Sequence, residues 1–67
     1  MSYYIVTDQG GQIRVNTWEE LLAEVETRME MLGAEGFQLR DDYESIDELM
    51  DHMNSYDIDE QYIEEVA

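Results

Sequence analysis

The side chains of this chain that could do chemistry are mainly carboxylates, which are far more numerous than its other charged groups. Eighteen Asp and Glu residues stand against three arginines and no lysine, which gives a formal net charge of −15 over 67 residues. Carboxylates can transfer protons, ligate hard cations or present negative charge to a basic surface. Repulsion among so many like charges destabilises a compact state. We therefore expect the charge to serve the recognition of a basic partner.

The acids and several tyrosines concentrate in the C-terminal part of the chain. Residues 41–67 carry eleven acids and no lysine or arginine, whereas residues 1–40 carry seven acids and all three arginines. Tyrosine is enriched in protein interfaces, where it adds rigid contact area to the charge. The expected partner-binding residues are Asp41, Asp42, Glu44, Asp47, Glu48, Asp51, Asp57, Asp59, Glu60, Glu64 and Glu65, with Tyr43, Tyr56 and Tyr62.

Neither a catalytic site nor a metal site is expected. The segment 57–59 begins like a calcium loop, but Tyr62 occupies the position that requires glycine. The single histidine, His52, lies four residues after Glu48, a spacing that favours an exposed ion pair over catalysis. Catalysis needs groups that converge in a pocket, and a domain of this size rarely encloses one. We expect no enzymatic activity, no metal and no cofactor.

The elements that position these residues begin with a β-hairpin. Residues 3–7 are aromatic and β-branched, which is typical of a strand. Residues 12–16 alternate polar and apolar side chains, as a second strand with one buried face would. Gly10-Gly11 between them can adopt positive φ and predicts the turn.

Two capping boxes predict two amphipathic helices. Thr17 and Ser45 are each followed three residues later by glutamate, which marks a helix start. Apolar residues then recur at helical spacing over 18–32 and over 46–54. Gly33 stands where a left-handed C-terminal cap is expected.

Residues 36–40 alternate again and predict a third strand. The tail from Asp57 to Val66 has the spacing of a short third helix, with a frayed end or an added strand as alternatives. The chain is thus expected to be one α+β domain over residues 1–67, ordered strand, strand, helix, strand, helix and, with the tail, a third helix. Its three-stranded, mainly antiparallel sheet has the order 2-1-3 and packs against two amphipathic helices.

Composition also bounds the compartment and the partners. No apolar run approaches the ~18 residues of a membrane span, and the absence of cysteine fits a reducing compartment, so we expect a cytoplasmic protein. The negative charge argues against anionic membranes and against direct nucleic-acid binding. Because a domain this small is near the lower size limit for folding alone, a homodimer is an open alternative.

In size, acidity and α+β pattern the chain resembles the small acidic phage-encoded anti-CRISPR and anti-restriction proteins. This resemblance implies an inhibitor that mimics DNA and occupies the basic nucleic-acid-binding cleft of a target such as a CRISPR effector, in the host cytoplasm. Fifteen charges correspond to about 25 Å of duplex DNA, close to the expected diameter of the domain. The alternatives are a generic acidic or regulatory partner of a basic protein, without DNA mimicry, and a halophile-type acidic domain whose charge only keeps it hydrated.

Overall fold

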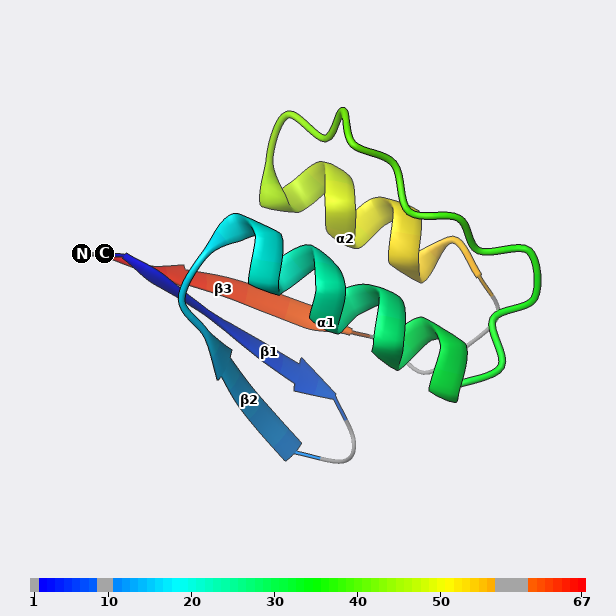
Figure 1. The fold of residues 1–67 in the computed structure, drawn as a ribbon, viewed down its shortest axis with the longest axis horizontal. Coiled ribbons are helices and arrows are strands. Elements are labelled where there is room, and N and C mark those ends of the chain that lie inside the picture. Colours follow the sequence, from blue (N-terminus) through cyan, green and yellow to red (C-terminus); the bar gives the residue numbers. More distant parts are fainter. Residues whose placement is uncertain (1, 9–10, 57–60) are drawn as a thin grey trace.

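Two layers make up the fold, a three-stranded sheet and a pair of helices on one of its faces (Figure 1). The structure is a computed structural model that describes residues 2–8, 11–56 and 61–67. Its radius of gyration is 11.1 Å, close to the value expected for a compact domain of this length. No helix in the described part of the chain is long and apolar enough to cross a membrane. The elements in chain order are β1 (Tyr3–Asp8), β2 (Gly11–Val15), α1 (Trp18–Met31), α2 (Ile46–Asn54) and β3 (Tyr62–Val66).

The sheet has the order β2-β1-β3, and both outer strands run antiparallel to β1. The predicted hairpin is confirmed, with pairing from Tyr4↔Val15 to Asp8↔Gly11. Gly11 begins β2 at a φ of 125°, a conformation that glycine adopts without strain. Gly10, the other residue of the predicted turn, lies outside the described residues. The α+β class, the sheet order 2-1-3 and the two helices are confirmed.

The prediction was wrong about which segment forms the third strand. That strand is β3, which pairs along β1 from Tyr3↔Val66 to Thr7↔Tyr62, so the tail from residue 62 is the added strand that was the alternative prediction, and not the expected helix. The element order is therefore strand, strand, helix, helix, strand. The physical reason is a contact between segments that lie far apart in the sequence. The second edge of β1 carries backbone N–H and C=O groups that need partners, and the tail supplies them by antiparallel pairing.

Residues 36–40, where the third strand was expected, form an irregular segment outside the sheet. The alternation behind that prediction is real, because Phe37 and Leu39 are half-buried against the core while the residues between and after them are exposed. A side chain replaces the neighbouring strand as a backbone partner, since the Tyr56 hydroxyl donates to the Gly36 carbonyl at 3.2 Å. In this segment the alternation of apolar and polar residues therefore reflects burial of one side, and not pairing with a neighbouring strand.

Both helices begin where the capping boxes predict. The Thr17 hydroxyl accepts the N–H of Glu20 at 3.1 Å, and the Ser45 hydroxyl accepts the N–H of Glu48 at 3.3 Å. Helix α1 ends at residue 31, one residue before the predicted end, and Gly33 follows with a φ of 76°. The N–H groups of Gly33 and of the next residue each donate to carbonyls of the last turn at 3.1 Å, the pattern of a Schellman cap.

The hydrophobic core lies between the sheet and the two helices, and every element contributes to it. The strands supply alternate residues and the helices supply residues spaced by four, as their geometries require. Full burial of a large apolar side chain stabilises the fold by roughly 1.5–3 kcal/mol. The buried apolar residues are Val6, Val15, Leu21, Val25, Met29, Leu49, Met53 and Ile63.

Helix α2 covers the beginning of the outer edge of β3. The Asn54 side chain donates from Nδ2 to the Gln61 carbonyl at 3.1 Å and accepts the Gln61 N–H on Oδ1 at 3.0 Å. Further along the edge, the N–H of Ile63 donates to the Met50 sulfur at 3.3 Å. The Asn54 amide thus takes the place of a neighbouring strand, and covering an edge in this way discourages unwanted pairing.

The other face of the sheet carries none of the core residues. Strand geometry directs its side chains away from the helices, and the register aligns them in rows across the three strands. We call this surface the open sheet face. Its residues are Tyr3, Ile5 and Thr7 of β1, Gln12 and Arg14 of β2, and Tyr62, Glu64 and Val66 of β3.

Candidate protein-interaction surface

Besides Glu20, which accepts the Asn16 N–H at 3.5 Å, the exposed sides of α1 and α2 carry five further carboxylates that pair with no arginine among the described residues. On α1 they are separated by seven and then four residues, and on α2 by four, so each set lies along one stripe of its helix. The corresponding axial rises are about 10.5 Å and about 6 Å. We call this set the acidic helix surface. It consists of Glu19, Glu26, Glu30, Asp47 and Asp51.

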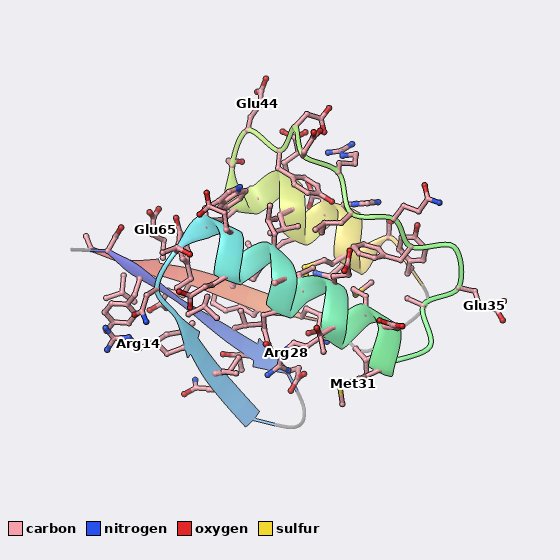
Figure 2. The ribbon with its side chains drawn as sticks, in the orientation of Figure 1. Arg14, Arg28, Met31, Glu35, Glu44 and Glu65 are labelled. Carbon is pink, nitrogen blue, oxygen red and sulfur yellow. The ribbon has the colours of Figure 1, made fainter. Side chains whose placement is uncertain are left out.

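Two of the acids predicted to bind a partner are engaged within the protein by Arg40. Its Nε lies 3.3 Å from Oδ1 of Asp42, and its Nη2 donates to Oε1 of Glu48 at 3.0 Å. Asp41 and Glu44 are exposed and have no arginine partner in the described chain. Figure 2 shows Glu44 projecting outward from the loop before α2. These two acids extend the negative surface beyond the helix.

Tyr43 and Tyr56, which were expected to contact a partner, are half-buried and point into the protein. The Tyr43 hydroxyl lies 2.7 Å from Nδ1 of His52, and the His52 ring stacks on Phe37 with centroids 4.9 Å apart. Tyr56 packs edge-on against Phe37 at 5.4 Å. The expected ion pair between His52 and Glu48 is replaced by this aromatic cluster, which fixes residues 37–43 against α2.

The predicted residues of β3 lie on two different faces of the sheet. Tyr62, which is 56% exposed, and Glu64 belong to the open sheet face. Glu65 points to the other side and is exposed near the end of the strand (Figure 2). They therefore form no single patch with the α2 acids. Three further predicted residues lie outside the described part of the chain, namely Asp57, Asp59 and Glu60.

The prediction missed the three glutamates of α1 in the acidic helix surface. The prediction compared the net charges of the two parts of the chain, and the N-terminal part is less negative because it also holds all three arginines. In the structure Arg28 is bound by Glu24, at 3.0 Å, and by Asp8, so it does not neutralise those three glutamates. Glu24 and Arg28 have the i,i+4 spacing at which helical ion pairs form. Spacing on the polar side of the helix was the signal that could have identified the missing residues.

Comparison of the chain with protein-family models, with known proteins and with solved structures found no match. The geometry alone therefore carries the functional argument.

A shallow hollow of about 300 Å³ lies beside the end of α1, lined by Asp8, Glu24, Arg28, Met31 and Leu32. Its two carboxylates both bind its one arginine, so its charged groups engage one another. Within the described residues no group of three or more His, Asp or Glu side chains is placed to hold a metal ion.

Proposed function

We propose that the protein is an inhibitor that mimics DNA and occupies the basic nucleic-acid-binding cleft of a target protein, in the manner of anti-CRISPR or anti-restriction proteins. One observation carries the proposal, namely that the charge is distributed unevenly in space. The acidic helix surface presents five carboxylates without arginine partners, whereas the open sheet face holds one arginine and one glutamate. Among the described residues, one side of the molecule is therefore strongly negative and the open sheet face is close to neutral.

The charge density supports mimicry in quantity as well as in sign. The long axis of the molecule is 34 Å, and a duplex of that length carries about 20 charges. The net charge of −15 is about three quarters of that value. Carboxylates four residues apart on a helix are separated by about 6 Å along the axis, close to the ~6.8 Å of two phosphate steps on one DNA strand. A groove lined with lysine and arginine would therefore meet carboxylates at nearly the spacing of phosphates on DNA.

Several of these acids oppose the stability of their own helix, which supports a role in binding. Asp47 and Asp51 form a like-charged i,i+4 pair, as do Glu26 and Glu30, and each such pair costs a few tenths of a kcal/mol. Glu30 also lies in the last turn of α1, where the helix dipole disfavours negative charge. Lysine in place of Asp51 or of Glu30 would stabilise the isolated fold, so the acidity of these two positions points to an external basic surface.

The test is capture of the target from a lysate of the cells in which the protein acts, followed by elution with salt or with duplex DNA. Two tagged variants with the same net charge are compared with the natural chain. Asp51→Lys alters the acidic helix surface, and Glu64→Lys makes the same change in charge on the open sheet face. We expect one nucleic-acid-binding protein or complex to be retained at moderate salt and displaced by DNA.

The matched pair separates mimicry from general acidity. The proposal expects Asp51→Lys to weaken retention markedly and Glu64→Lys to change it little, because a few central contacts dominate an interface. Equal weakening by both variants would mean that total charge alone sets binding. Retention that excess DNA does not affect would favour an acidic partner protein without mimicry. Loss of all bound proteins at low salt would leave hydration of the protein as the role of the charge.

A further inference from the structure

The open sheet face is the part of this acidic protein where a second molecule could approach with little repulsion. Among the described residues, its only charged ones are Arg14 and Glu64, and the others include Tyr3, Ile5, Tyr62 and Val66. Tyr62 is 56% exposed, and none of these residues belongs to the hydrophobic core. An aromatic and aliphatic surface without net charge is unusual on a chain with a net charge of −15.

Arg14 is distinguished from the other two arginines by its surroundings. Arg28 and Arg40 each bind two carboxylates, but Arg14 pairs with no carboxylate among the described residues. Its guanidinium lies 3.9 Å from the centroid of the Tyr3 ring, and its Nε donates to the side chain of Asn16 at 3.2 Å. Its terminal nitrogens thus remain able to bind a carboxylate from outside.

The register places Arg14 and Glu64 at opposite edges of a single row. Ile5 pairs with Arg14 on β2 and with Glu64 on β3, so the row reads cation, apolar centre, anion across the sheet. A two-fold axis along β1 would set each β2 opposite β3 of a second copy. That operation brings Arg14 of each copy over Glu64 of the other and Ile5 over its own equivalent. The face is therefore complementary to itself under one particular symmetry.

We propose that two copies of this chain pair through their open sheet faces about this axis, as a sandwich with two symmetric Arg14–Glu64 ion pairs. Sheets packed face to face lie about 10 Å apart with their strands about 30° from parallel. The helices of both copies then lie on the outside, so the acidic helix surfaces face solvent on opposite sides. The pairing does not rest on the proposed function.

The area of the face predicts a weak and reversible dimer. Three strands at ~4.8 Å spacing and five residues at ~3.4 Å rise give a footprint of about 250 Å² per copy. Stable complexes usually bury about 800 Å² of accessible surface per partner. Repulsion between two copies of charge −15 weakens the pairing further at low salt, because screening is then slight. Added salt should strengthen self-association, whereas it should weaken binding to a basic target.

The test measures the dimerisation constant by analytical ultracentrifugation over a wide concentration range, at low and at moderate salt. We expect a monomer–dimer equilibrium that shifts toward the dimer with salt. Glu64→Arg should weaken dimerisation at least tenfold, although it lowers the net charge and thereby the repulsion. Arg14→Glu should weaken it likewise, and the double variant with both changes should restore it, because the exchange re-forms both ion pairs.

Glu65→Arg is the matched control, since it makes the same change in charge on the other side of β3. It should dimerise at least as well as the natural chain, and circular dichroism checks that every variant folds. A chain that stays monomeric at all concentrations and salts would overturn the pairing and leave the face to a different protein. A dimer that Glu64→Arg does not weaken, or that the double variant fails to restore, would overturn the proposed geometry.

Discussion

Replacing Asp51 by lysine should stabilise the isolated protein, because the structure places Asp51 one turn after Asp47 on the exposed side of α2. The present pair repels by about 0.2–0.5 kcal/mol, and an Asp–Lys pair in this order attracts by a similar amount. The electrostatic gain is therefore about 0.4–1 kcal/mol. In a domain of this length it corresponds to a rise in Tm of roughly 2–8 °C.

Thermal denaturation at low ionic strength measures the effect, with Asp51→Gln as the matched control. Glutamine and lysine have similar helix propensities, so the difference between the two variants isolates the new attraction. Glutamine should provide about half of the electrostatic gain, and about 1 M salt should reduce the advantage of lysine over glutamine. An unchanged or lower Tm for Asp51→Lys would refute the claim that this acid opposes the stability of the helix.

Three other perturbations test the fold. Raising the ionic strength from low to moderate should raise the Tm by screening the repulsion within the chain, and a flat profile in calorimetry would contradict this. Tyr43→Phe removes the hydroxyl that contacts His52 and that accepts the N–H of Arg40, so urea unfolding should show a loss of about 0.5–1.5 kcal/mol; an unchanged midpoint would deny the hydroxyl a structural role. Asn54→Ala takes both side-chain partners from the Gln61 backbone and should cost about 1–3 kcal/mol, with faster hydrogen exchange at the Gln61 amide; exchange as slow as in the natural chain would show that the edge is covered in another way.

Local signals were sufficient to predict the hairpin and both helices. The capping residues Thr17 and Ser45 and the C-terminal Gly33 act through hydrogen bonds within a few residues, so their effect can be recognised in the sequence. The third strand could not be assigned in this way. Residues 36–40 and 62–66 both mix apolar and polar residues, and only pairing with the distant strand β1 shows that residues 62–66 are the third strand.

The candidate site was predicted in part for the same reason. The acidity of α2 was clear from the sequence, and Asp47 and Asp51 are exposed as expected. Tyr43 and Tyr56 pack inside the protein because the segment after α1 folds back against α2. The spacing of residues in the sequence does not reveal such a long-range contact. The neutrality of the open sheet face likewise depends on the register of all three strands, so it became visible only in three dimensions.

The most direct test of DNA mimicry is an equilibrium titration of the captured target with this protein at increasing concentrations of duplex DNA. If the protein occupies the DNA-binding cleft, its apparent Kd should rise in proportion to the DNA concentration once the DNA exceeds its own Kd. An apparent Kd that stays constant as DNA saturates the target would contradict the account, because protein and DNA would then bind at separate sites.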